Sequence, residues 1–171
     1  MSMVKELPQR KRMRAAYHDY SDGVYFVTMC TQNRRCILSQ IVGTGVLDGP
    51  QIVLKRCGEI AEKYIRQMDA FYENIAVDGY VIMPNHIHLL LVVKSCGGGP
   101  SGTPVPTLQN SVVSRFVSTF KRFCNKECGE NIWQYRSYDH VIRSVADYDE
   151  HAKYICENPA RWQDDELYCA Q

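Results

Sequence analysis

The sequence predicts an α+β domain with the element order β-α-β-β-α-β and one further helix near its C-terminal end. Strand signals, which are short runs of β-branched and aromatic residues, occur at 24–31, 75–82, 86–93 and 132–142. Helix signals, in which apolar residues recur at steps of three and four, occur at 55–68 and 108–126. The chain has 171 residues, which is enough for one domain with a substantial core.

The first strand starts after Gly23, and the segment 40–50 that follows is expected to be a loop because it is rich in glycine and ends in proline. Only the residues Met-Pro-Asn at 83–85 separate the second strand from the third. These two strands are therefore expected to form a hairpin closed by a tight turn.

The last helix is expected to begin at Ser144, because a serine hydroxyl is a typical N-cap, and to end near Glu157, before Pro159. The complete order is the ferredoxin-like arrangement, an antiparallel sheet with helices, extended by a C-terminal helix.

We expect a basic N-terminal arm at 1–20, a single domain at 21–162 and a C-terminal tail at 163–171. Within the domain, the segment 95–107 is rich in Gly, Pro and Ser and is expected to be a flexible loop. No apolar run approaches the ~20 residues that cross a bilayer, and the polar N-terminus lacks the apolar core of a signal peptide. These features predict a cytoplasmic protein without a membrane partner.

The eight cysteines contain no Cys-x-x-Cys pair. A zinc ribbon or a disulfide framework would show tighter spacing. We therefore expect free thiols in a reducing compartment, some of them as small core residues.

The formal net charge of +1 does not by itself indicate a nucleic-acid partner. Clusters of basic residues are more informative, because contacts with phosphate depend on local charge. The candidate DNA-binding residues from these clusters are Arg12, Arg14, Arg34, Lys121, Arg122 and Arg136. Tyr17, Tyr20, Tyr135 and Tyr138 lie near them in the sequence and would suit unpaired bases, on which aromatic rings stack. The alternatives are that the basic residues are solvated surface charges and that the tyrosines pack in the core.

His86 and His88 start the third main strand, where alternate side chains point to one face. Two imidazoles about 6–7 Å apart at the backbone can share one divalent metal ion if a third ligand joins them. Tyr154 and Asn158 are four residues apart and share one face of the last helix. Asn158 is the candidate third ligand, and Tyr154 could face a metal-bound phosphate. The alternatives are core histidines, a packing tyrosine and a C-capping asparagine.

Five motifs follow one another along roughly residues 10 to 162. They are Tyr25-Phe-Val-Thr-Met-Cys-Thr31, Met83-Pro-Asn-His-Ile-His88, Ile132-Trp-Gln134, Asp139-His-Val-Ile-Arg143 and Tyr154-Ile-Cys-Glu-Asn-Pro159. This series resembles the REP-associated tyrosine transposases, a branch of the single-tyrosine HUH transposases. The pair formed by the second and fifth motifs is the most specific part of the resemblance.

The resemblance implies a ferredoxin-like fold, Mg²⁺ or Mn²⁺ as cofactor, and single-stranded DNA, often near a hairpin, as the partner. Carried over by motif, His86 and His88 match the metal-binding histidines, Asn158 the third ligand and Tyr154 the nucleophile. Lys121 and Arg143 fall in blocks that resemble DNA-facing surfaces. A nucleoid-associated location follows from such a partner.

The predicted function is that of a DNA transposase that cleaves and rejoins single strands through a covalent 5′-phosphotyrosine. A phenol has a pKa of ≈ 10 and needs help to attack at neutral pH; His140 and His151 are candidate proton acceptors. If Tyr154 were not the nucleophile, Tyr148, Tyr138 and Tyr135 would be tested next. The alternatives are a domesticated DNA-binding module that does not cut, a metal-dependent phosphoester hydrolase and a structural protein. Monomer and homodimer both stay open.

Overall fold

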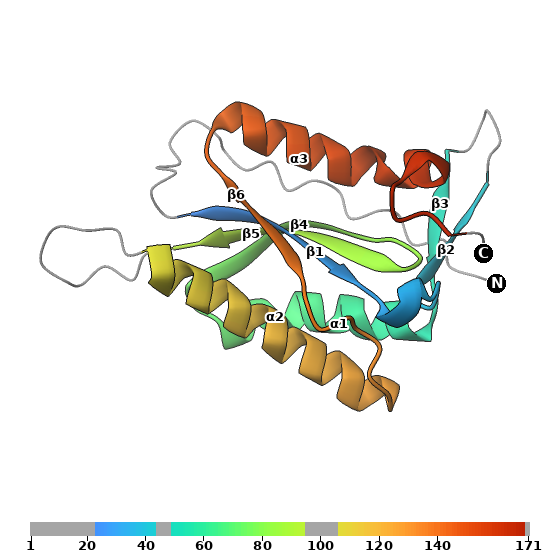
Figure 1. Cartoon of the computed structure of the whole chain (residues 1–171), viewed down its shortest axis with the longest axis horizontal. Coiled ribbons are helices and arrows are strands. Elements are labelled where there is room, and N and C mark those ends of the chain that lie inside the picture. Colours follow the sequence, from blue (N-terminus) through green and yellow to red (C-terminus); the bar gives the residue numbers. More distant parts are fainter. Residues whose placement is uncertain (1–22, 44–48, 95–105, 170–171) are drawn as a thin grey trace, which may run out of the picture.

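The computed structural model describes residues 23–43, 49–94 and 106–169 (Figure 1). The expected arm at 1–20, with Arg12, Arg14, Tyr17 and Tyr20, lies outside the described residues, as does most of the expected loop at 95–107.

A four-stranded antiparallel sheet is the centre of the molecule. Its strands are β1 (Val24–Cys30), β4 (Ile75–Ile82), β5 (His86–Val93) and β6 (Tyr138–Ile142), in the spatial order β4-β5-β1-β6. The helices α1 (Arg56–Phe71) and α2 (Pro106–Cys128) cover one face, and α3 (Val145–Glu157) covers the other (Figure 1). The α+β class and the additional C-terminal helix are thus confirmed.

The expectation of a loop at 40–50 is wrong at its N-terminal end, because residues 40–42 belong to a strand, and a second short strand that the sequence did not predict begins just after the segment, at Gln51. β2 (Ser39–Val42) and β3 (Gln51–Leu54) pair antiparallel as a separate two-stranded sheet. Each strand has only four residues, so the glycines and the proline between them dominate the sequence signal. The expected strand at 132–142 is also shortened to β6, and a 3₁₀ turn, η2 (Gln32–Arg34), follows β1.

The alternation of side chains along the central strands divides the apolar residues into two cores. Odd-numbered residues of β5, such as Ile87 and Leu89, pack with α1 and α2, where Ile65 and Phe120 are also buried. Even-numbered residues such as Leu90 pack with the α3 side of the sheet. Any side chain at positions 86 and 88 therefore lies between the sheet and α3.

The last helix begins and ends as its sequence predicts. Ser144 is the N-cap, and its side chain accepts a hydrogen bond of 3.1 Å from the backbone N–H of Asp147. After α3, Pro159 lies in the 3₁₀ helix η3 (Asn158–Asp164), which turns the chain back toward the sheet. Within the described ranges, no helix is both long and apolar enough to cross a membrane.

Candidate active site

His86 and His88 lie side by side on the α3 face of β5, with ring centroids 4.6 Å apart. Both are buried, at 0% and 3% exposure. In the register of the sheet they stand opposite Cys30 and Thr28 of β1. The prediction that the two imidazoles share one face is confirmed.

The Nδ1 atoms of both histidines lie within hydrogen-bond distance of a polar side chain, whereas the Nε2 atoms do not. Nδ1 of His86 is 2.8 Å from Oδ1 of Asn85, and Nδ1 of His88 is 2.8 Å from Oγ1 of Thr28. Because an amide oxygen only accepts, Nδ1 of His86 carries the proton and Nε2 presents its lone pair. Neither buried Nε2 atom has a hydrogen-bond partner in the part of the chain that the structure describes.

Burial keeps both imidazoles neutral. It lowers the pKa of His86 to about 3, with a smaller contribution from the charge of Arg34, and it lowers the pKa of His88 well below its usual value. Neutral imidazole is the form that binds a metal ion.

The C-terminal end of α3 places Tyr154 and Asn158 over the histidines. The Tyr154 ring lies edge-on to His88, with centroids 5.2 Å apart, and its side chain is 39% exposed. Asn158 is the C-cap of α3 and is buried at 2% exposure. Its Oδ1 atom is a further buried polar atom that has no partner among the described residues.

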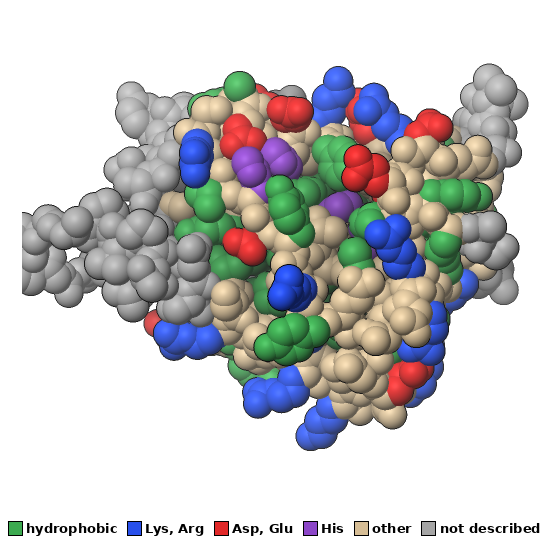
Figure 2. Space-filling model, viewed as in Figure 1, with side chains coloured by type: hydrophobic (Ala, Val, Ile, Leu, Met, Phe, Trp, Pro, Cys, Tyr) green, Lys and Arg blue, Asp and Glu red, His purple; other side chains and the backbone are tan. Residues whose placement is uncertain are grey.

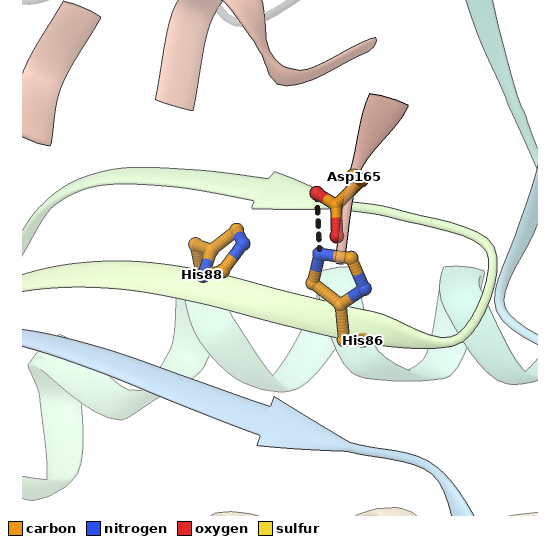
Figure 3. Close-up of side chains that lie close together, drawn as sticks. All are labelled: His86, His88 and Asp165. Atoms are coloured by element: carbon orange, nitrogen blue, oxygen red, sulfur yellow. Dashed lines mark ion pairs between the residues drawn. The ribbon is translucent and has the colours of Figure 1, made fainter. Parts of the chain in front are cut away.

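Asp165, which the sequence analysis did not single out, completes the cluster (Figure 3). Its Oδ2 atom accepts hydrogen bonds from Nδ2 of Asn158 at 3.0 Å and from the hydroxyl of Tyr154 at 3.3 Å, and it lies 3.9 Å from Nε2 of His86. The carboxylate is only 3% exposed. In the sequence it belongs to an acidic run at 164–166 that is typical of solvated surface, so only the turn made by η3 reveals it.

These residues suit a divalent metal ion. One ligand atom from each of His86, His88 and Asp165 lies within 4.8 Å of the others. The donor atoms without partners, two imidazole nitrogens and one amide oxygen, offer lone pairs that would otherwise be buried at a cost of about 1–3 kcal/mol each. Thr28 and Asn85, which lie 2.8 Å from the Nδ1 atoms, orient the two rings, as hydrogen-bond partners of metal-binding histidines commonly do.

The hydroxyl of Tyr154 is protonated at neutral pH. Burial raises its pKa, and the negative charge of Asp165 raises it further. The proton must therefore leave when the oxygen attacks, and the Asp165 carboxylate is already in hydrogen-bond contact with it.

A second polar cluster joins His140, Asp147 and His151. Asp147 lies 3.1 Å from a ring nitrogen of each histidine. The two rings stack nearly parallel, at 14° and 4.8 Å between centroids, so their in-plane lone pairs do not converge on one point. This arrangement favours a hydrogen-bonded cluster over a chelate. His151, a candidate proton acceptor from the sequence, is half-buried against Phe26.

The expected DNA-binding residues fall in different environments. Arg34, Arg122, Arg136 and Arg143 are exposed. Lys121 is half-buried and donates hydrogen bonds to the backbone carbonyls of residues 134, 135 and 136, at 2.9, 3.3 and 3.2 Å. Its ammonium therefore fixes the connection that leads into β6.

A groove of about 660 Å³ is lined both by this connection and by His88. It is lined on one side by Arg136 and Tyr138 and on the other by His151, Tyr154 and Asp165. Figure 2 shows histidine, acidic and hydrophobic side chains gathered on this face, with basic side chains near them. Tyr135, beside the groove, is 98% exposed.

Comparisons with known proteins agree with the motifs. A REP-associated tyrosine transposase of Escherichia coli strain K12 is 29% identical over 140 residues, which cover 81% of this chain and 67% of the relative. An uncharacterised protein of Haemophilus influenzae is 28% identical over 173 residues, covering 93% of each chain. No family model matches the sequence.

The solved structure of a REP-associated tyrosine transposase bound to a REP hairpin is similar in fold. Its TM-score is 0.57 at 24% identity, and the match covers 85% of this chain and 72% of that one. In both sequence and fold, the protein is similar to tyrosine transposases. The chain is a relative of the REP-associated tyrosine transposases, as its motifs predict.

Proposed function

We propose that this protein is a metal-dependent tyrosine transposase that cleaves and rejoins single-stranded DNA through a covalent 5′-phosphotyrosine. One observation carries the proposal. Three buried atoms that could each offer a lone pair to a metal ion, Nε2 of His86, Nε2 of His88 and Oδ1 of Asn158, have no hydrogen-bond partner among the described residues and belong to the same site as a half-exposed tyrosine. Such atoms are costly in a folded protein unless a ligand uses them.

In this proposal, His86, His88 and Asn158 hold Mg²⁺ or Mn²⁺. Imidazole ligands suit Mn²⁺ better than Mg²⁺, which prefers oxygen ligands. When bound, the ion would neutralise charge on the scissile phosphate and polarise its P–O bonds.

Tyr154 is the proposed nucleophile. Its oxygen forms a bond with phosphorus as the bond to the 3′ oxygen breaks, and the DNA is left with a 5′-phosphotyrosine and a 3′-hydroxyl. Asp165 is the proposed acceptor of the phenol proton, because it already accepts the hydrogen bond from that hydroxyl. His151 and His140 are less suited, since among the described residues the hydroxyl of Tyr154 is hydrogen-bonded to Asp165 and to neither histidine. The covalent bond conserves the linkage for rejoining by a 3′-hydroxyl.

The groove is the proposed path for the DNA strand. Arg136 offers a charge for phosphate, and Tyr135 and Tyr138, which are 98% and 64% exposed, offer faces for unpaired bases. Lys121 holds this connection in place from below. Arg34, Arg122 and Arg143 are proposed as further phosphate contacts. A hairpin-containing substrate is proposed because the solved relative is bound to one.

We also propose that the fold is ferredoxin-like, and this topology supports the proposed site. Without β2 and β3, the chain order β1-α1-β4-β5-α2-β6 and the sheet order β4-β5-β1-β6 fit the ferredoxin-like arrangement. In this arrangement the first and third of the four strands lie in the middle of the sheet. The histidine pair therefore sits on a central strand, which is a rigid support for a catalytic site.

The test is a denaturing gel of the protein mixed with labelled hairpin DNA from a pool of genomic flanking sequences, with Mn²⁺. The proposal predicts a covalent protein–DNA band that is lost in Tyr154→Phe and in His88→Ala. Asp165→Asn should slow formation of the band at least about 100-fold, in line with the loss of a general base. Loss of Mn²⁺ binding in this variant would instead assign Asp165 to the metal ligands. Binding of DNA without any band would favour a non-cutting module, and cleavage that survives in Tyr154→Phe would favour a hydrolase.

A further inference from the structure

Two cysteines that are far apart in the sequence meet beside the active site. Cys36 follows η2, and Cys169 follows η3; their Sγ atoms lie 2.6 Å apart. Both are half-buried free thiols in the structure. A disulfide has its sulfurs at about 2.05 Å, so a small movement separates this pair from a covalent bond.

The segment 165–169, which ends at Cys169, also carries the active-site carboxylate of Asp165. Apart from the sulfur contact, the segment is attached to the sheet side of the molecule by non-covalent contacts with Arg34 and Asn85, including a distance of 3.3 Å from Sγ of Cys169 to the carbonyl oxygen of Arg34. Nδ2 of Asn85 donates to the carbonyl of Leu167 at 2.7 Å, and Arg34 donates to the carbonyl of Glu166 at 3.4 Å. Surface segments that are held by hydrogen bonds alone can open locally, so a covalent attachment would change how long Asp165 stays in the site.

Asn85 connects the same segment to a metal-binding histidine. Its side chain is buried, with Oδ1 bonded to Nδ1 of His86 at 2.8 Å. Its Nδ2 atom donates both to the carbonyl of Leu167 and, at 3.3 Å, to Sγ of Cys169. The position of Cys169 therefore affects the amide that orients His86, in addition to the carboxylate beside Tyr154.

We infer that Cys36 and Cys169 are a redox modification site, where a reversible disulfide fixes residues 165–169, and with them Asp165, against the active site. The disulfide itself is independent of the proposed function, whereas its effect on catalysis rests on it. Because both thiols are free in the structure, the disulfide is inferred to form and break reversibly and to act as a switch rather than as a permanent structural bond. A small-molecule disulfide such as oxidised glutathione is the oxidant.

The exchange has two steps and balances in atoms and electrons. Cys169 attacks the oxidant, which forms a mixed disulfide and releases one thiol; Cys36 then attacks Sγ of Cys169, which forms the internal disulfide and releases the second thiol. Both cysteine protons end on the released thiols. Burial and the contact with Cys169 raise the pKa of the Cys36 thiol to about 12, and the exchange balances in the same way if Cys36 attacks the oxidant first.

The first experiment treats the full chain with oxidised glutathione and measures intact mass and disulfide-linked peptides. The inference predicts a loss of two hydrogen atoms, a peptide pair that joins Cys36 to Cys169, and full reversal by dithiothreitol. Cys169→Ser should abolish the linkage. The control Cys156→Ser changes an exposed cysteine of α3 that takes no part in the linkage, and it should leave the linkage intact. A glutathione adduct on Cys169 without the internal linkage would overturn the inference.

The second experiment asks whether the linkage fixes the segment. Hydrogen exchange at residues 165–169 should slow about tenfold or more in the oxidised protein, and formation of the Tyr154–DNA adduct should become faster. If neither redox form makes an adduct, the proposed function fails, whereas the linkage and its effect on exchange stand. Unchanged exchange in the fully oxidised protein would overturn the inference.

Discussion

Acid should destabilise the metal-free protein through His86 and His88. Burial lowers the pKa of His86 to about 3 and that of His88 well below its usual value, whereas both titrate near 6.5 in an unfolded chain. Below pH 6.5 the unfolded state therefore binds more protons than the folded state, so stability present above this pH is lost as the pH falls. For two histidines the loss is about 4 kcal/mol at pH 5, a large part of a typical total of 5–15 kcal/mol.

The assay is urea unfolding with EDTA at about pH 8 and about pH 5, followed by the fluorescence of Trp133 and Trp162, the two tryptophans of the chain. A variant with both His86→Gln and His88→Gln has no imidazole at these positions and supplies the background from every other group. The wild type should lose about 4 kcal/mol more than this variant between the two pH values. An equal loss in both proteins would refute the reasoning, since the histidines would then be charged or solvated in the folded state.

Three further predictions concern the metal and the packing. Mn²⁺ at about 100 times its Kd should add about 2.7 kcal/mol and raise Tm by roughly 5–11 °C, and His88→Ala should show no such rise in a thermal melt. Gly58→Ala should destabilise α1 although alanine is the better helix former by about 1 kcal/mol, because its Cβ would stand 1.9 Å from the carbonyl oxygen of Leu38; equal or higher Tm would contradict this contact. Lys121→Met should cost about 1–3 kcal/mol in urea unfolding, since it leaves carbonyl groups of 134–136 without their donor, and no loss would assign this lysine to the surface.

Much of the fold follows from local patterns in the sequence. The period of two along 86–93 places both histidines on one face. Only residues 83–85 connect β4 to β5, so the two strands pair antiparallel as a hairpin. The hydroxyl of Ser144 and the ring of Pro159 set where α3 begins and where it gives way to η3. Such signals are local, because each depends on residues within a few positions.

The parts that the sequence could not supply depend on contacts between distant residues. β2 and β3 are four residues long, and β2 is anchored by a hydrogen bond from Ser39 to the carbonyl of Ile82, 43 positions away. The sequence predicts that Lys121 is a basic surface residue. In the fold its ammonium donates to three backbone carbonyls, because residues 134–136 pass close to it. Asp165 is an acidic tail residue by its neighbours, and only η3 brings it to His86.

The pairing of Tyr154 with Asn158 lies between these two cases. Their spacing of four predicts a shared face of the helix, and α3 confirms it. That this face lies over the histidines depends on which side of the sheet α3 covers, which spacing does not encode. The resemblance of the motifs supplied that step, and the contact of the Tyr154 ring with His88 agrees with it.

The most direct test of the central claim is peptide mapping of the protein after reaction with hairpin-containing single-stranded DNA and Mn²⁺. The account predicts one modified peptide, with a 5′-linked nucleotide on Tyr154, which disappears with EDTA and in His88→Ala. A nucleotide on another tyrosine, such as Tyr138 at the mouth of the groove, or cleaved DNA without any modified peptide, would contradict the assignment of Tyr154 as the nucleophile.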